Sequence, residues 1–440
     1  MDSGEDQGDW INARNPFFET FMPLGNKGDK SAPTIFSIYS LGIATGRDAW
    51  AYNFSRSHFE INMSSMIATY NRETARYAQA CEGLNKDLWP EVETIVDANP
   101  KRISWTRSLK SDTKKRKVYE FEQASLTPSM YRPFTKEWLY FNRRFNEIIY
   151  QMPRLFPTPE HDNIVISATG IGASKAFSAL VTKTLPDLEM ISKGQCFPLY
   201  WYEKVEGTET PDRSSDMFSD EAAPDARGYI RHEAITDTAL EAFRAHYADT
   251  TIRKEDLFWY VYGILHLPEY KERFASDLKK MLPRIPYAGD FWAFSRAGRA
   301  LGEWHLHYET VEPYPLTEDA PKPLADTDYR VTTMAFGKKD GKADKTVIVY
   351  NAHLTLRDIP LEAYDYVVNG KSAIEWIMER YAVTVDRDSE IRNDANDWPD
   401  DPRYIVDLVK RVVRVSVETV EIIRGLPSLE RGSLVGDLSV

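Results

Sequence analysis

The chain has 440 residues, of which 42% are hydrophobic and 12% aromatic, so two or three packed units are expected and general disorder is excluded. Its two cysteines exclude a disulfide framework and a thiolate zinc site, and the lack of an export signal or of any long apolar run excludes a membrane protein, which together predict a cytoplasmic protein. The net charge of −12 excludes indiscriminate coating of nucleic acid, because such binding depends on neutralising phosphates with Lys and Arg.

The first part of the chain predicts an irregular segment followed by helices. Residues 10–47 mix proline, glycine and aromatic residues without clear periodicity. Ser57 and Glu60 form a capping-box pattern, and apolar residues then recur at helical spacing as far as Tyr77, which predicts a helix of about six turns. A second helix is predicted over 88–98, ended by the Asn-Pro pair that follows it.

The middle of the chain predicts short strands, turns and one helix. Aromatic and β-branched residues around a turn-like Ser-Asp pair predict a hairpin over 101–121. A broad apolar stripe at helical spacing predicts a helix over 135–150. Short apolar runs predict strands over 163–168 and 197–202, with a glycine turn at 170–172.

The second half of the chain is predicted to be mainly helical. The acidic segment 206–227 indicates a mobile surface loop. Beyond it, amphipathic periodicity predicts helices over 237–247, 254–266, 268–281 and 291–308. The chain then predicts a proline-rich linker over 313–323, strands over 330–336 and 345–350 around an Asp340-Gly341 turn, and closing helices over 372–381 and 402–424.

The sequence contains no complete catalytic motif. Asn15-Pro16-Phe17-Phe18 is similar to the Asn-Pro-Pro-Tyr/Phe with which amino-methyltransferases hold a flipped adenine, but the second proline is missing and only fourteen residues precede it. An ordinary loop with two buried phenylalanines is therefore favoured. The histidines lack metal-ligand spacing, since His305 and His307 would point to different faces of a helix. We expect no catalytic residue, cofactor site or metal site in this chain.

A glycine-rich turn follows the predicted strand over 163–168. Gly170-Ile171-Gly172-Ala173-Ser174-Lys175 lacks the spacing of a P-loop and the third glycine of a dinucleotide fingerprint. Closely spaced glycines still allow backbone N–H groups to approach an anion. Two interpretations stay equally open: a tight turn, or a contact to the DNA backbone through Ser174 and Lys175.

A basic cluster lies within the predicted hairpin over 101–121. Eight cations stand against one acid, Asp112, within seventeen residues, and Trp105 lies among them. Most charge runs are solvated faces, but this excess is more than solubility requires in an acidic chain, so contact with DNA is favoured. The candidate residues are Lys101, Arg102, Arg107, Lys110, Lys114, Lys115, Arg116 and Lys117.

The segment Tyr131-Arg132-Pro133-Phe134, running into Trp138-Leu139-Tyr140-Phe141, resembles the recognition region of adenine-methylating type II and type ISP restriction enzymes. Further blocks extend the resemblance over nearly the whole chain: Asp9–Asn12, Asp48–Ser55, Ser167–Lys175, Lys193–Tyr200, Tyr260–His266 and Tyr364–Trp376. The chain is therefore similar to the C-terminal specificity region of type ISP enzymes.

This resemblance implies recognition of an asymmetric sequence in double-stranded DNA. In type ISP enzymes, recognition licenses adenine methylation, or ATP-driven translocation and cleavage, by methyltransferase, helicase-like and nuclease domains whose motifs this chain lacks. S-adenosylmethionine, ATP and magnesium would therefore bind the absent domains, and the methyltransferase and helicase domains are the expected protein partners. Arg132 and Lys136 are candidates for DNA contact, although Arg132 can equally anchor a turn by pairing with an internal carboxylate.

These observations predict an α+β fold, with a mixed β-strand recognition core and a helical-bundle subdomain. The expected organisation is an irregular lead-in from the missing methyltransferase (1–56), a mixed α/β DNA-recognition core with a basic hairpin (57–235), a helical bundle (236–312), and a hairpin with C-terminal helices (313–440). The predicted function is sequence-specific binding of duplex DNA. The alternative is an interaction or structural module that docks onto methyltransferase or helicase domains, for which no salt-dependent, sequence-dependent DNA affinity is expected.

Overall fold

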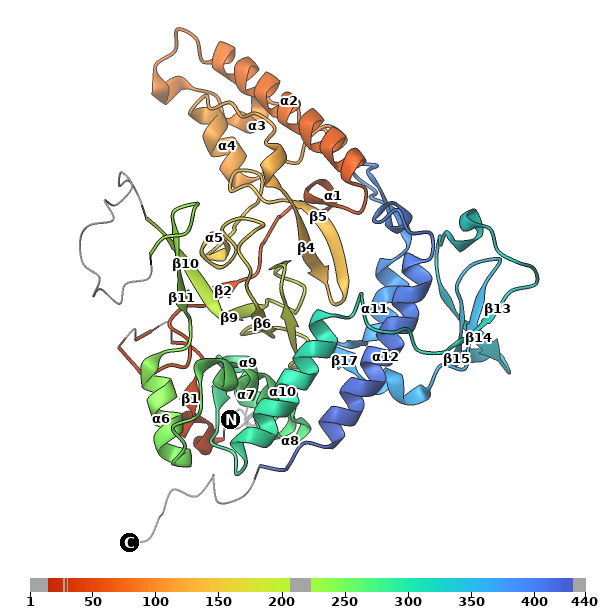
Figure 1. Cartoon of the computed structure of the whole chain (residues 1–440). Coiled ribbons are helices and arrows are strands. Elements are labelled where there is room, and N and C mark those ends of the chain that lie inside the picture. The colour runs from red at the N-terminus through yellow and green to blue at the C-terminus, as the bar shows by residue number, and fades with distance from the viewer. Residues whose placement is uncertain (1–14, 27, 30, 206–222, 430–440) are drawn as a thin grey trace, which may run out of the picture.

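The computed structural model describes residues 15–26, 28–29, 31–205 and 223–429. Figure 1 shows a helical arm at the top, central strands below it, helices α6 to α10 at the bottom, and α11 and α12 beside a further sheet. Residues 1–14 and most of the predicted mobile loop over 206–227 lie outside the described residues.

One long helix forms the arm, as the sequence predicts. After the short α1 (Asp48–Ala51), α2 (Arg56–Ala80) begins at Ser55, whose hydroxyl accepts the N–H of His58 at 3.4 Å. The helix predicted over 88–98 is wrong in most of its length. Only the 3₁₀ turn η2 (Lys86–Leu88) and the single turn α3 (Val92–Ile95) form. Pro90 lies between them and disfavours the helical conformation of Trp89, the residue before it.

The basic segment 101–121 contains a helix, so the predicted hairpin is wrong. The helix α4 (Arg107–Lys114) begins at Thr106, whose hydroxyl accepts the N–H of Leu109 at 3.2 Å. Leu109 and Thr113 are fully buried, and the hydroxyl of Thr113 lies 3.3 Å from that of Thr74 on α2. The basic residues therefore belong mainly to a helix and the turn after it, which pack against α2 and form part of the arm.

Two four-stranded sheets form the centre of the molecule. The first has the order β2-β9-β6-β7, with strands at Ser40–Leu41, Gln195–Pro198, Val165–Ala168 and Ala179–Thr182. The second has the order β3-β5-β4-β8, with strands at Tyr52–Asn53, Thr135–Tyr140, Leu126–Arg132 and Leu185–Pro186. The helix predicted over 135–150 is therefore wrong, whereas β6 confirms the strand predicted over 163–168 and β9 with β10 (Tyr200–Lys204) divide the strand predicted over 197–202.

The helices below the sheets follow the predicted periodicity closely. Helices α6 (Asp237–Tyr247) and α7 (Lys254–His266) have the predicted bounds. The segment predicted as one helix over 268–281 is divided into α8 (Pro268–Arg273) and α9 (Ala275–Lys280), and α10 is Phe291–Leu306. These helices share one apolar core with β6, β7 and β9.

Helices α7 and α10 approach each other closely because glycine faces the contact. A Cβ atom on Gly298 would lie 1.8 Å from the backbone oxygen of Trp259 and 2.8 Å from the backbone nitrogen of Gly263. No real Cβ tolerates such a distance from backbone atoms, so any side chain at this position must separate the two helices.

We therefore expect Gly298→Ala to lower the free energy of unfolding by about 1–3 kcal/mol, the usual cost of overpacking a core. Chemical denaturation followed by circular dichroism measures this change. Arg296→Ala is the matched control, because Arg296 is exposed on the same helix and its truncation should change stability by less than about 0.5 kcal/mol. Equal midpoints for the two variants would contradict the expectation.

The C-terminal part contains a further antiparallel sheet and two helices. The sheet order is β13-β16-β15-β14, with strands at Thr317–Asp319, Thr355–Arg357, Lys342–Val349 and Ala335–Lys339. The hairpin predicted around Asp340-Gly341 is confirmed, with strands that lie closer to the turn than predicted, while the predicted linker contains β13. Helices α11 (Ala373–Arg380) and α12 (Tyr404–Arg424) lie within the predicted segments.

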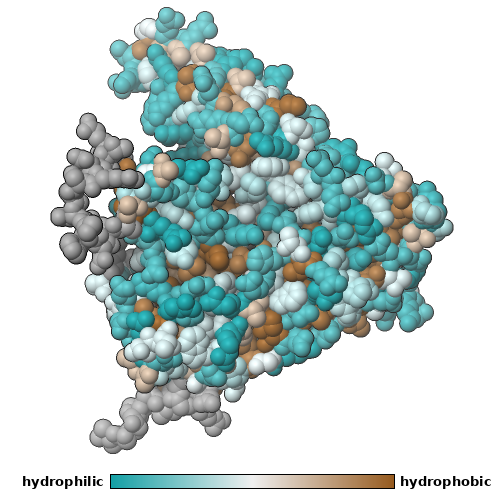
Figure 2. All heavy atoms as spheres, in the orientation of Figure 1, coloured by the Kyte–Doolittle hydropathy of each residue, from teal (hydrophilic) through white to brown (hydrophobic). Residues whose placement is uncertain are grey.

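Further short elements of the described fold include one helix and four strand pairs. They are α5 (Met152–Leu155) and the strand pairs β1 (Met22–Pro23) with β12 (Arg284–Ile285), β10 with β11 (Tyr229–Glu233), β17 (Val367–Val368) with β18 (Lys371–Ser372), and β19 (Val383–Val385) with β20 (Arg392–Asp394). The mixture of helices and small sheets confirms the predicted α+β class. The face shown in Figure 2 is mainly hydrophilic. None of the described helices combines the length and hydropathy needed to cross a membrane.

The Asn-Pro-Phe-Phe segment is a cap and a packing element. The side chain of Asn15 accepts the N–H of Phe17 at 3.1 Å and so begins the 3₁₀ turn η1 (Pro16–Thr20). Phe18 is fully buried, but Phe17 is 41% exposed, so the expectation of two buried phenylalanines is half correct.

Candidate nucleic-acid interface

The basic cluster of 101–117 is largely paired with acids. On α4, Lys110 pairs with Glu93 at 2.8 Å and Lys114 with Glu91 at 2.9 Å. The other pairs are Lys101 with Glu390 at 2.5 Å, Arg102 with Asp97 at 3.2 Å, and Lys117 with Asp112 at 3.5 Å. Five of the eight predicted cations therefore lie beside a carboxylate, which weakens the local positive field.

The remaining three cations of this cluster are exposed. Arg116 lies over the ring of Trp89 at 5.2 Å. Within the part of the chain that the structure describes, Arg107 and Lys115 make no side-chain ion pair or hydrogen bond. The cluster thus presents scattered charges on the arm, and it does not form the continuous strip along a hairpin that the sequence predicts.

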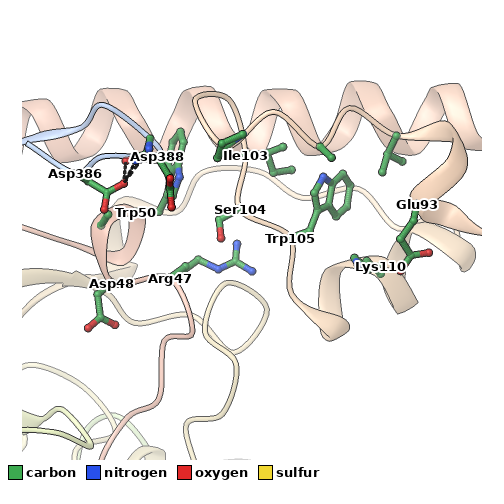
Figure 3. A pocket seen from close by; sticks show the side chains of 15 residues that line it. Arg47, Asp48, Trp50, Glu93, Ile103, Ser104, Trp105, Lys110, Asp386 and Asp388 are labelled. Atoms are coloured by element: carbon green, nitrogen blue, oxygen red, sulfur yellow. Dashed lines mark hydrogen bonds and ion pairs between the residues drawn. The ribbon is translucent and has the colours of Figure 1, made fainter.

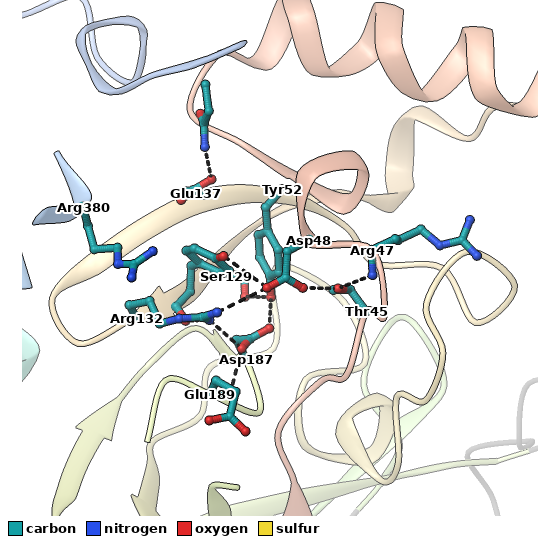
Figure 4. A network of polar contacts seen from close by, with 12 residues as sticks. Thr45, Arg47, Asp48, Tyr52, Ser129, Arg132, Glu137, Asp187, Glu189 and Arg380 are labelled. Atoms are coloured by element: carbon teal, nitrogen blue, oxygen red, sulfur yellow. Dashed lines mark hydrogen bonds and ion pairs between the residues drawn. The ribbon is translucent and has the colours of Figure 1, made fainter. Parts of the chain in front are cut away.

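Arg132 lies inside the protein in a network of polar contacts (Figure 4). Its guanidinium donates to Asp187 at 2.8 Å and to Asp48 at 3.2 Å, and it lies over the ring of Tyr131 at 3.8 Å. Asp187, which is only 3% exposed, also accepts the hydroxyl of Tyr52 at 3.1 Å. The structure therefore places Arg132 in the anchoring role that the sequence leaves open as the alternative to DNA contact.

Strand β5 carries two further charged residues whose partners lie much later in the chain. Burial raises the pKa of Glu137 to about 7, opposed by a hydrogen bond from Asn393 at 2.8 Å. Lys136, the second candidate from the resemblance, pairs with Glu309, and its side chain is 12% exposed. Both residues thus join the central sheet to later segments, and Lys136 has little surface to offer a ligand.

The glycine turn after β6 is anchored at both of its glycines. The N–H of Gly170 donates to the carbonyl of Ser192 at 3.0 Å, and the N–H of Gly172 donates to the carbonyl of Lys279 at 2.9 Å. Gly172 has a φ of +70°, and the Lys193 ammonium donates to its carbonyl at 2.8 Å. The two glycine N–H groups are therefore occupied by protein carbonyls and do not bind an external anion.

Three segments meet beside this turn and gather lysines from distant parts of the sequence. The N–H of Asn369, in the β17–β18 turn, donates to Ser178 at 3.0 Å, and Lys175 extends along the neighbouring Gly370. A cavity of about 460 Å³ lies at this junction, lined among others by Ser174 and by Lys175, Lys271 and Lys279, with one acid, Glu272.

The lysines of this junction are candidates for binding an anion. None of Lys175, Lys271 and Lys279 makes a side-chain ion pair or hydrogen bond with any described residue. Burial lowers the pKa of Lys271, opposed by Glu272, because an ammonium in a half-buried place loses hydration. We name this cluster, with Ser174, the lysine junction.

Lys271 and Lys279 are site candidates that the sequence did not single out. Both lie on the predicted helix over 268–281, where they read as an ordinary solvated face. Only the packing of α8 and α9 against the glycine turn brings them to Lys175.

Comparison with known families decides what kind of domain this is. Residues 34–408 match the family model described as the Type ISP C-terminal specificity domain. The chain belongs to this family. No curated protein matches the sequence.

Solved structures similar to this specificity domain contain DNA. A nuclease-deletion mutant of the Type ISP restriction-modification enzyme LlaGI, in complex with a DNA substrate mimic, is 34% identical with a TM-score of 0.79. The ATP-dependent Type ISP enzyme LlaBIII bound to DNA is 32% identical with a TM-score of 0.80, and a DrdV–DNA complex is 30% identical with a TM-score of 0.79. Each match covers 97% of the specificity domain but only 30%, 25% and 40% of the respective longer chains.

The specificity domain also has a cavity of about 510 Å³, lined by residues 47–50, by residues of the arm between 93 and 110, and by the loop between β19 and β20 (Figure 3). Figure 3 shows the side chain of Arg47 among the lining residues, below Ser104, although it is largely buried. Burial lowers the pKa of Arg47 to about 10, opposed by Glu147, and its Nε and Nη2 atoms have no hydrogen-bond partner among the described residues. The wall carries four acids against two cations, so the cavity does not suit a phosphate; the acids are Asp48, Glu93, Asp386 and Asp388, and the cations are Arg47 and Lys110.

Proposed function

We propose that this specificity domain recognises a sequence in double-stranded DNA and carries out no reaction of its own. The observation that carries the proposal is the similarity, over 97% of the chain, to parts of LlaGI, LlaBIII and DrdV in structures that contain DNA. An identity of 30–34% and TM-scores near 0.8 support a common binding role as well as a common fold.

The same proposal assigns the chemistry to other parts of a longer cytoplasmic protein. The chain spans 25–40% of the three longer chains that it matches. Sites for S-adenosylmethionine, ATP and magnesium would then lie in methyltransferase and helicase domains, which are also the natural protein partners of this domain. Recognition would direct those domains to one place on the DNA.

We assign the phosphate contacts of this function to the lysine junction more than to the arm. Phosphate contacts fix the register of a protein on a duplex, and they require cations that are free to exchange counter-ions. Lys175, Lys271 and Lys279 meet this requirement, with one acid beside them, whereas most cations around α4 already have carboxylate partners. Base-reading residues would lie on loops next to these contacts.

Binding of a fluorescein-labelled duplex, followed by anisotropy over a series of salt concentrations, tests the proposal. We expect measurable affinity that falls with salt, with log K decreasing by about 0.9 per phosphate contact for each tenfold rise in salt. A docking module for other protein domains would show no such affinity. Absence of binding to any duplex in dilute buffer, by a chain whose circular dichroism shows it to be folded, would overturn the proposal.

A further inference from the structure

The β14–β15 hairpin ends in a tight and well-defined turn. Asp340 and Gly341 connect the strands and have φ values of +50° and +77°. Two successive residues with positive φ are typical of the two-residue turns that match the twist of a hairpin. Lys339 and Lys342 therefore lie directly opposite each other at the end of the ladder, and Lys338 faces the other side of the ribbon.

An irregularity in the ladder changes the direction of this turn relative to the sheet. Phe336 pairs with Ile348, but the next residue, Gly337, pairs with Asp344, so three residues of β15 have no partner on β14. A Cβ atom on Gly337 would lie 2.8 Å from the Cβ of Val347, so the bulge is tightly packed. Bulges bend the bulged strand and re-aim the residues beyond it.

The bulge is fixed to the rest of the domain by its own lysine. Lys345 pairs with Glu375 at 3.2 Å and lies over the ring of Tyr364 at 4.9 Å. The neighbouring Asp344 accepts both the N–H and the hydroxyl of Thr346, at 3.0 and 2.6 Å. Lys345 is thus paired within the bulge, whereas Asp344 keeps its negative charge and interacts electrostatically with Lys339.

The three lysines at the end of the hairpin outnumber the two acids beside them, Asp340 and Asp344. Lys338, Lys339 and Lys342 are exposed, and none makes an ion pair within the described ranges of the chain. Asp340 lies within the turn itself, and Asp344 lies two residues beyond Lys342. Like charges directly opposite each other on a ladder are unfavourable, and an anion between Lys339 and Lys342 would relieve this repulsion.

We propose that this hairpin end is a second contact to duplex DNA, which holds the phosphodiester backbone without reading its sequence. The inference rests on the proposed function and adds a surface to the lysine junction. A two-stranded ribbon fits against a groove of B-form DNA, and lysines on both of its faces can reach phosphates on either side. The rigid turn and the packed bulge hold these charges in place before binding.

The test compares duplex binding by the whole chain and by the variant Lys338→Glu/Lys339→Glu/Lys342→Glu. We expect the triple variant to bind mixed-sequence duplex more weakly, with a salt slope smaller by about 1 for each phosphate that it no longer neutralises. Its affinity for target and non-target duplexes should fall by the same factor, because the hairpin end does not read bases.

Asp340→Asn is the matched variant of opposite sign. Asparagine adopts positive φ readily and suits this turn, and the substitution removes the negative charge that lies between Lys339 and Lys342 in the chain. We expect tighter binding and a steeper salt slope, with unchanged circular dichroism.

The outcomes separate the two proposals. If the unaltered chain binds no duplex, the proposed function fails and the hairpin contact fails with it. If the unaltered chain binds but the triple variant binds with the same affinity and slope, the hairpin contact alone is overturned. Unchanged DNA binding together with self-association of the triple variant would assign these lysines to protection of an edge strand, which also overturns the inference.

Discussion

Arg132→Met is expected to lower the free energy of unfolding at pH 8 by about 3–5 kcal/mol, the cost of removing one partner from a buried ion pair. The substitution leaves Asp187 buried without its guanidinium and opens the contact to Asp48. It also removes the cation that lies over the ring of Tyr131. Urea denaturation measures the loss. Arg143→Met, on an exposed neighbouring arginine, is the control and should change stability by less than about 0.5 kcal/mol.

The loss of stability should depend on pH through Asp187. Burial and the charge of Asp48 raise the pKa of Asp187 to about 7, and Arg132 opposes this. When folding raises the pKa of a carboxyl, the protonated carboxyl contributes stability to the folded state. This contribution is fully present below the unfolded pKa of about 3.9, and it is lost as the pH rises through the folded pKa. Without Arg132 the pKa of Asp187 rises further. Arg132→Met should therefore lower the free energy of unfolding by less at pH 5 than at pH 8. The same loss at both pH values would contradict the assigned role of Asp187.

Reversal of two charges in the lysine junction is expected to have the largest effect on DNA affinity. For Lys175→Glu/Lys279→Glu, two fewer neutralised phosphates predict binding roughly 10–100-fold weaker at about 0.1 M salt. Both side chains are exposed, so the fold should remain intact. Anisotropy with mixed-sequence duplex measures the change, and Lys175→Gln/Lys279→Gln should give an intermediate loss.

The arm provides the comparison for this result. Reversal of Lys114, Lys115, Arg116 and Lys117 to Glu is expected to weaken binding to all sequences alike if the basic cluster contacts DNA. Because Lys114 and Lys117 already pair with Glu91 and Asp112, we expect a smaller loss of affinity per charge there than at the lysine junction. A greater loss per charge on the arm would reverse the assignment of the phosphate contacts.

The amphipathic helices could be predicted from the sequence because their buried positions are apolar. Helix α7 shows this, since its bounds follow from a run of aromatic and aliphatic residues that are all buried in the structure. The capping box predicted at Ser57 and Glu60 is wrong, because Ser55 is the residue whose side chain caps α2.

Strand β5 could not be predicted because polar residues occupy its inward positions. The alternate residues Thr135, Glu137 and Leu139 of this strand are buried, but only the leucine is apolar. Glu137 is accommodated by Asn393, which is far away in the chain. The apolar residues of this segment therefore follow a helical spacing in the sequence, whereas the burial of its residues alternates with a period of two in the structure.

Helix α4 could not be predicted for the same reason, because its buried face includes the polar residues Asp112 and Thr113.

For the candidate interface, the sequence indicates Ser174 and Lys175, because glycines mark the turn that carries them. It could not indicate Lys271 or Lys279, since their proximity to that turn depends on how α8 and α9 pack. Pairing of the arm's cations with acids such as Glu91 and Glu390 is equally invisible before folding.

Selection from a pool of duplexes with a randomised central segment tests most directly whether this domain recognises a DNA sequence. The 440-residue chain is immobilised, the bound duplexes are recovered and amplified over several rounds, and the pool is sequenced. We predict that one short asymmetric sequence becomes enriched, and that a duplex carrying it binds more tightly than its scrambled counterpart at the same salt concentration. A pool whose composition stays that of the input, although duplexes are retained at low salt, would contradict sequence recognition by this domain.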